Sequence, residues 1–160
     1  MTDLAVIETH PIQYHAPVYR ELQARLGISV SAIYASDFSV AGYVDTEFGT
    51  SFAWDTDLLS GYEYQFLSRV AHGGARTPED ATIHGLEEAL EEVAPRAILL
   101  TGYSPRFYRN AFRTALRHGA PLLFRAETTD HARRRGAIKR FVRDNALRYV
   151  YGKCAALLYV

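Results

Sequence analysis

The 160-residue sequence has little of what marks several classes of protein. Its only cysteine, Cys154, has no second cysteine for an internal disulfide, which favours a reducing compartment. No apolar run approaches the roughly 18 residues that span a bilayer. The opening residues, MTDLAVIE, lack the basic and long apolar segments of a signal peptide. We therefore expect a cytoplasmic protein, with Cys154 as a small core residue rather than a nucleophile.

Several chemical signatures are also missing. The sequence contains no G-x-G-x-x-G after its first predicted strand, which disfavours a bound dinucleotide, and no G-x-x-x-x-G-K-[ST], which argues against a P-loop NTPase. It has neither a G-x-S-x-G elbow nor an H-E-x-x-H helix motif. Cysteine-ligated metal is disfavoured too, so we expect no cofactor and no metal centre.

The residues that are present alternate between strand and helix patterns. Hydrophobic residues make up 48% of the chain and charged residues 22%, as in an ordinary globular domain. The patterns predict strands over 4–9, 28–35, 62–67, 97–102, 121–127 and 155–160, and helices over 17–26, 79–94, 105–118 and 135–151. Residues 36–61 are predicted to be irregular. This alternation predicts one α/β domain over 1–160, a Rossmann-like, doubly wound and mainly parallel sheet with helices on both faces.

Apolar spacing also predicts which face of each helix is buried. The inward residues of the first helix are Val18, Leu22 and Leu26, and those of the second are Leu86, Ala89, Leu90 and Val93. The third helix is expected to bury Tyr108, Ala111, Phe112, Ala115 and Leu116. The fourth is expected to bury Ile138, Phe141, Val142 and Tyr149.

Loops that follow the strands carry the polar and aromatic residues. In open α/β sheets ligands bind at the carboxyl ends of the strands. The loops THPIQYHAP, SDFSVAGYVDTEFG, TGYSPR and RAETTDH should therefore converge on one edge. The long segment 36–61 carries several aromatic and acidic residues, which suit either stacking on sugar rings or packing within the loop itself.

The turn after the first strand is the leading candidate site. It carries His10, Gln13, Tyr14 and His15 where a structural turn would need only small polar residues. A polar ligand-binding turn is one interpretation. Two others stay open: the histidines cap the next helix, or they bind a metal, although no carboxylate lies at ligand spacing beside them.

Two further loops supply candidates. Gly102 allows close approach of a ligand, and Tyr103 and Ser104 begin a helix, a place suited to an anion or to hydroxyl groups. Arg125 and Glu127 alternate along a strand end and can point the same way. His131 either acts on a substrate or is simply solvated.

Charge is unevenly spread although the net charge is zero. Residues 79–92 hold six acidic side chains and no Lys or Arg, whereas residues 133–153 hold eight Lys or Arg side chains and one acidic side chain. Four arginines at 106, 109, 113 and 117 form a stripe on the third helix. The first interpretation is a set of solvated faces. The second is attraction of the basic helix 135–151 to an anionic membrane, and nucleic acid comes third because no base-reading motif is present.

Three stretches closely resemble the N-terminal half of GT-B glycosyltransferases of the family 4 (group 1) type. They are THPIQYHAPVYREL, YASDFSVAGYVDTEFGTSFAWDTDLLSGYEYQFL and FRAE. The resemblance implies an acceptor-binding N-terminal domain of a retaining, metal-independent enzyme that transfers a sugar from a nucleotide-sugar donor to a glycan or lipid-linked acceptor. His10, Gln13, Tyr14, His15, Tyr103, Ser104, Arg125 and Glu127 would then line the acceptor side of a cleft, and His131 would match a cleft histidine.

The same resemblance implies a partner domain. In this family a C-terminal domain binds the donor through an E-x7-E pair and basic residues, and such a domain cannot lie within 160 residues already used for one domain. We therefore expect a fragment that is inactive alone, from polysaccharide or lipid-linked glycan assembly in the cytoplasm, at or near the inner face of the membrane. The alternatives are a free-standing α/β binding module without catalysis and half of a GT-B nucleotide-sugar epimerase.

Overall fold

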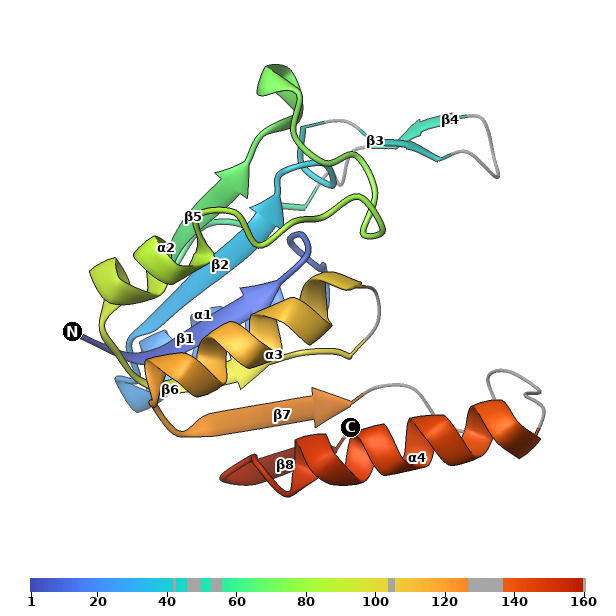
Figure 1. Ribbon diagram of the computed structural model, residues 1–160. Helices are drawn as coiled ribbons and strands as arrows, with labels where there is room; N and C mark the ends of the chain where they lie inside the picture. The colour runs from blue at the N-terminus through green and yellow to red at the C-terminus, as the bar shows by residue number, and fades with distance from the viewer. Residues whose placement is uncertain (42, 46–49, 53–55, 104–105, 127–136, 160) are drawn as a thin grey trace.

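The computed structural model describes residues 1–41, 43–45, 50–52, 56–103, 106–126 and 137–159, with the backbone alone for 43–45, 50–52, 126, 137–143 and 159. Helices and strands alternate along most of the chain (Figure 1). The elements are β1 Thr2–Glu8, α1 Ala16–Leu26, β2 Val30–Ser36, β3 Tyr43–Asp45, β4 Thr50–Phe52, β5 Glu63–Ser68, the 3-10 helix η1 Val70–His72, α2 Leu86–Val93, β6 Pro95–Leu100, α3 Arg106–His118, β7 Leu122–Ala126, α4 Ala137–Tyr151 and β8 Ala156–Tyr159.

Six strands form one sheet in the order β5-β2-β1-β6-β7-β8, and every neighbouring pair is parallel. The spatial order matches the Rossmann order, in which the chain runs outward from a central strand and then returns to build the other half. The predicted fold class is therefore confirmed. The direction of the strand order reverses between β1 and β6, which places a topological switch point at their carboxyl ends.

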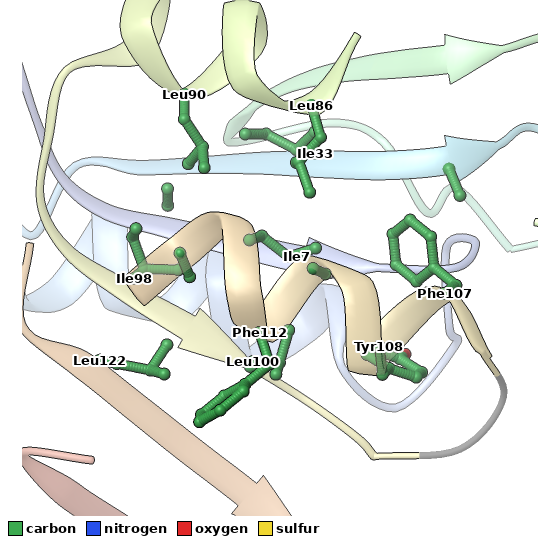
Figure 2. Packing of buried hydrophobic residues seen from close by; sticks show 14 of the residues in the cluster. Ile7, Ile33, Leu86, Leu90, Ile98, Leu100, Phe107, Tyr108, Phe112 and Leu122 are labelled. Carbon is green, nitrogen blue, oxygen red and sulfur yellow. The ribbon is translucent and has the colours of Figure 1, made fainter. Parts of the chain in front are cut away.

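Each face of the sheet has its own apolar core. On one face Ile7, Ile33 and Ile98 pack under α2 and α3 (Figure 2). The last turn of α4 joins this core through Val150 and Tyr151. On the other face α1 covers Val6 and its neighbours. Alternating side chains along the strands thus fill two layers, as a doubly wound sheet requires.

The buried face of α1 differs from the predicted one. Val18 and Leu26 are 44% and 67% exposed, whereas Ala16 and Tyr19 are buried. Leu22 is only partly buried. The helix is rotated relative to the prediction because the Tyr19 hydroxyl reaches the buried carboxylate of Glu8. A polar contact, invisible to a hydrophobic pattern, decides which side of this helix faces the sheet.

The second helix begins later than predicted. α2 starts at Leu86 rather than near residue 79. Thr77 and Asp80 form a side-chain turn, in which Thr77 Oγ1 lies 2.8 Å from the Asp80 carboxylate. Gly85 then adopts φ +82°, a left-handed conformation that glycine tolerates and that cannot lie inside a helix. Acidic residues before Gly85 thus belong to a turn, while the predicted inward residues Leu86, Ala89 and Leu90 are buried.

The third and fourth helices agree with the pattern only in part. α3 buries the predicted Tyr108, Ala111, Phe112 and Ala115, and its four arginines are exposed as expected. In α4, Tyr149 is 60% exposed rather than inward. The neighbouring Tyr151 packs on Phe124 with ring centroids 5.7 Å apart. The other predicted inward residues of α4, namely Ile138, Phe141 and Val142, have side chains outside those described.

The segment predicted to be irregular contains a small antiparallel pair, β3 and β4. Phe38 and Leu58, on either side of this pair, are buried. The remaining aromatic side chains of the segment up to Trp54 lie outside those described. Within the described ranges, no helix combines the length and the apolar character needed to cross a bilayer.

Candidate functional site

The turn after β1 lies at the switch point, beside the end of β6. It runs from Thr9 to His15, where α1 begins. Backbone bonds fold it tightly: the His15 and Ala16 N–H groups both donate to the Ile12 carbonyl, at 3.0 and 3.1 Å. Ser39, from the loop after β2, braces it from the side by donating its hydroxyl to the Pro11 carbonyl at 2.9 Å. The turn is therefore held both by its own backbone hydrogen bonds and by the loop after β2.

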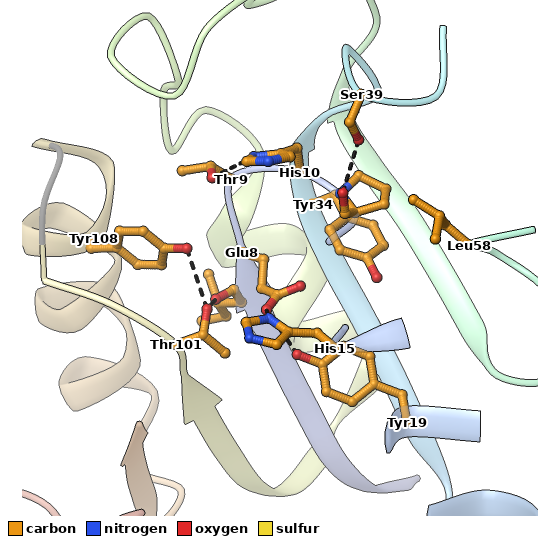
Figure 3. A network of polar contacts seen from close by, with 12 residues as sticks. Glu8, Thr9, His10, His15, Tyr19, Tyr34, Ser39, Leu58, Thr101 and Tyr108 are labelled. Atoms are coloured by element: carbon orange, nitrogen blue, oxygen red, sulfur yellow. Dashed lines mark hydrogen bonds and ion pairs between the residues drawn. The ribbon is translucent and has the colours of Figure 1, made fainter. Parts of the chain in front are cut away.

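A buried carboxylate supports this turn from below (Figure 3). Glu8, the last residue of β1, is fully buried. Its Oε1 lies 2.5 Å from His15 Nδ1 and 2.8 Å from the Tyr19 hydroxyl, which donates to it. Its Oε2 has no hydrogen-bond partner among the described residues. One carboxylate thus joins the end of a strand to the first turn of a helix.

Tyrosines surround the same carboxylate. Burial first, and then the Glu8 carboxylate, raise the pKa of Tyr19 well above its ordinary value. The same causes raise the pKa of Tyr34, whose hydroxyl lies 2.8 Å from that of Tyr62. Tyr62 in turn donates to the Leu58 carbonyl. These phenols stay protonated at neutral pH, so each can act as a hydrogen-bond donor.

A second group of hydroxyls joins β1 to β6 and α3. Thr101 Oγ1 lies 3.2 Å from the Tyr108 hydroxyl and 3.3 Å from the Ile7 carbonyl (Figure 3). Burial, with a smaller contribution from the Glu8 carboxylate, raises the pKa of Tyr108 to about 12. Hydrogen bonds to Thr101 and Thr9 act in the opposite direction. The end of β6 is thereby fastened to the start of α3.

His10 occupies the rim of the turn. Its ring packs on Phe38 with centroids 4.4 Å apart, and its Nδ1 lies 2.9 Å from Thr9 Oγ1. Burial, and then the charge of His15, lower the pKa of His10 to about 4. His10 is therefore neutral at physiological pH, and its imidazole can both donate and accept a hydrogen bond.

The loop after β2 also holds neighbouring loops in place. Asp37 Oδ1 accepts the Val70 N–H at 2.8 Å, and its Oδ2 lies 3.7 Å from an Arg69 guanidinium nitrogen. Ser36 donates to the Ala75 carbonyl at 2.6 Å. These bonds tie the loops after β2 and β5 together at the same edge of the sheet as the turn.

The structure separates the sequence-predicted residues of the turn into two groups. Gln13 and Tyr14 are exposed, Tyr14 by 58%, and His10 is half-buried. His15 is buried and supports the turn rather than facing solvent. It occupies the N-cap position of α1 without a side-chain cap bond, so the capping interpretation is wrong for this residue. Its ring lies edge-on to Tyr14, 4.9 Å away.

The other predicted residues are placed as follows. Tyr103 and Arg125 are partly buried, after β6 and near the end of β7. Leu123, two residues earlier in β7, packs in the core under α1, so the alternation of the strand places Arg125 on the same face of the sheet as the Glu8 network. Ser104, Glu127 and His131 lie outside the described residues. Gly102 makes room for a ring rather than a ligand, because a Cβ there would lie 2.9 Å from Tyr108 Cε2.

No metal centre is visible in the described ranges, where no three His, Cys, Asp or Glu side chains could hold an ion. Sequence reasoning missed the residues that organise the site, which are Glu8, Tyr19, Thr101 and Tyr108. A usable signal was present for one of them. Glu8 ends an otherwise apolar strand, seven residues before a histidine at the start of a helix.

Comparison with protein-family models, curated proteins and solved structures finds no match to this chain. The case for a function therefore rests on the geometry at the switch point and on the residues of the turn.

Proposed function

We propose that the chain is the acceptor-binding domain of a retaining, metal-independent GT-B glycosyltransferase of the family 4 type. The observation that carries the proposal is the rigid turn at the switch point, which exposes Gln13 and Tyr14 while Glu8 and His15 hold it from below. An exposed aromatic ring can stack on a sugar, and an amide can both donate to and accept from its hydroxyls.

The position of the turn supports the same proposal. Ligands of doubly wound sheets bind outside the carboxyl ends of the strands at the switch point. Tyr103 follows β6, and Arg125 is the penultimate residue of β7, so both lie at the same edge of the sheet. A sugar acceptor seated there meets neutral donors and acceptors from the turn and one guanidinium from β7. The nucleotide-sugar donor would be gripped by a second domain.

Two further parts of the proposal rest on the basic residues of α4 and on what the resemblance to the family implies. The acceptor is a glycan or a lipid-linked glycan, used in polysaccharide assembly in the cytoplasm. The basic helix α4 would approach an anionic membrane surface, since Arg148 and the following Lys153 are exposed.

The experiment is a binding and turnover test on the purified chain. Methyl glycosides of glucose, galactose, mannose, rhamnose and N-acetylglucosamine, and their disaccharides, are titrated by calorimetry. We expect weak binding of at least one glycan, and we expect Gln13→Ala and Tyr14→Ala to abolish it. Tyr64→Ala, which changes another exposed tyrosine, should keep it. UDP-, GDP- and ADP-sugars should show no turnover. Transfer or epimerisation of any of them by this chain would contradict the proposal.

A further inference from the structure

A groove lies between α3 and α4, and at one end its lining reaches Gly102 and Tyr103 after β6. The two helices flank a groove of about 530 Å³. Its floor is apolar and comes from the sheet and from α3, through Leu100, Phe124 and Phe112. Its other wall is α4, through Leu147 and Val150. A volume of roughly 300–1,000 Å³ with apolar walls is typical of small-molecule sites.

The groove is held open by contacts at the C-terminal end of α4. Tyr151 packs on Phe124, with ring centroids 5.7 Å apart, and Tyr149 meets Phe112 edge-on at 6.3 Å. The Cys154 thiol donates to the Val150 carbonyl at 3.1 Å. α4 is thus fixed to the sheet at this end, while Leu147 and the exposed Ala146, one turn earlier, face the groove.

The rim of the groove is cationic. Arg109 and Arg113 belong to its lining, and both are exposed. Arg113 donates only to the Asn110 side chain in the described hydrogen bonds, and α3 contains no carboxylate with which to pair. The Lys153 ammonium lies 5.9 Å from the Tyr149 ring at the far end. In contrast, Arg117 is occupied by Glu87 at 3.4 Å and lies outside the lining.

An apolar floor beneath cations that have no carboxylate partner among the described residues favours one class of ligand. A neutral apolar molecule would leave the arginines unused, and a small anion would leave the floor exposed to water. We propose that the α3–α4 groove binds a single-chain anionic amphiphile, with the alkyl chain along Phe112 and Leu147 and the anionic head between Arg109 and Arg113. The groove shares Tyr103 with the proposed glycan site at the switch point, but its apolar floor and its two arginines belong to the groove alone.

Calorimetry with decyl phosphate below its micelle concentration tests the proposal on the whole chain. We expect decyl phosphate to bind at one site and inorganic phosphate alone to give no heat. Decyl maltoside, which has a neutral head, should bind at least about tenfold more weakly. Raising the salt to about 0.5 M should weaken decyl phosphate binding, because dissolved ions screen the attraction between the exposed arginines and the phosphate group.

Matched variants locate the site. Arg109→Glu and Arg113→Glu should each weaken decyl phosphate binding about tenfold. Arg106→Glu makes the same charge change at an exposed position of α3 outside the lining, and should have little effect. Ala146→Trp fills the groove and should abolish binding of both amphiphiles. Circular dichroism confirms that each variant folds, and the exposed arginine variants keep the test decisive if Ala146→Trp does not.

Three results would overturn the proposal: no binding of decyl phosphate; equal losses in Arg106→Glu and Arg109→Glu; or unchanged binding in a folded Ala146→Trp. Binding of anionic vesicles alone, with no heat from monomeric decyl phosphate, would assign the positive charge to a membrane surface and would overturn it as well.

Discussion

The Glu8 carboxylate and the His15 imidazole lie 2.5 Å apart, both buried, although seven residues separate them in the chain. The contact joins the last residue of β1 to the N-cap of α1 and spans the turn between them, in which Gln13 and Tyr14 are exposed. The same carboxylate oxygen accepts the Tyr19 hydroxyl. The turn is therefore shaped by a polar network that solvent does not reach, which limits how far a bound ligand can move it.

Removing the acceptor at Glu8 should be costly. Glu8→Leu leaves the His15 and Tyr19 donors buried without a partner, and we expect a loss of about 3–5 kcal/mol in the free energy of unfolding. Glu8→Gln keeps an acceptor oxygen and should lose about 1–2 kcal/mol. Urea denaturation measures both. A Glu8→Leu protein as stable as the wild type would show that the network does not hold the turn.

Protonation of His10 should make the stability of the protein depend on pH. Its pKa is about 4 in the folded chain against an ordinary value of 6.5. The unfolded chain therefore binds the proton first as the pH falls, so stability is lost between pH 6.5 and pH 4, by up to about 3 kcal/mol. Comparing wild type with His10→Gln isolates this contribution from the carboxylates. An NMR titration that gives His10 a pKa of 6.5 or more would refute it.

Gly102→Ala should destabilise the protein by about 1–3 kcal/mol, the range for forcing an atom into a packed core. The added Cβ would lie 2.9 Å from the Tyr108 ring, which is itself held by Thr101. The test is a double-mutant cycle with Tyr108→Ala, in which the clash disappears. The same loss from Gly102→Ala with and without the Tyr108 ring would rule out this explanation.

Arg20 should matter to stability more than Arg25 of the same helix. Its Nε and guanidinium nitrogen donate to the Ser60 and Asp57 carbonyls at 3.0 and 2.9 Å, which fixes the loop before β5. Among the described residues, the polar contact of Arg25 is an exposed one with Glu21 at 3.4 Å. We expect Arg20→Met to lose about 1 kcal/mol and Arg25→Met less than about 0.5 kcal/mol. Thermal and urea melts of the pair decide, and equal losses would contradict the assignment.

Most of the sheet could be predicted from the sequence because most of its strands are short apolar runs next to helix patterns. The start of α2 could not, because the acidic residues before Gly85 resemble a helix start, and only the glycine's left-handed backbone shows the boundary. The rotation of α1 was also hidden. Val18 and Leu26 fit an apolar stripe, yet the hydrogen bond from Tyr19 to Glu8 turns them outward.

The candidate site was predictable in position but not in detail. The rule that ligands bind at the carboxyl ends of strands predicts a site at the turn with Gln13 and Tyr14. The same rule does not predict that His15 faces inward, because its orientation depends on the carboxylate of Glu8, which lies at the end of an apolar strand. The contact between Thr101 and the Ile7 carbonyl joins residues 94 positions apart, and no local pattern reports such a pair.

The most direct test of the central claim is an NMR map of glycan binding to the isotope-labelled chain. Amide shifts are followed while the methyl glycosides and disaccharides named above are added. We expect the shifts to concentrate in residues 9–15, 101–103 and 125–126 and to vanish in Tyr14→Ala. Shifts confined to another surface, or none with any glycan, would contradict an acceptor site at the switch point.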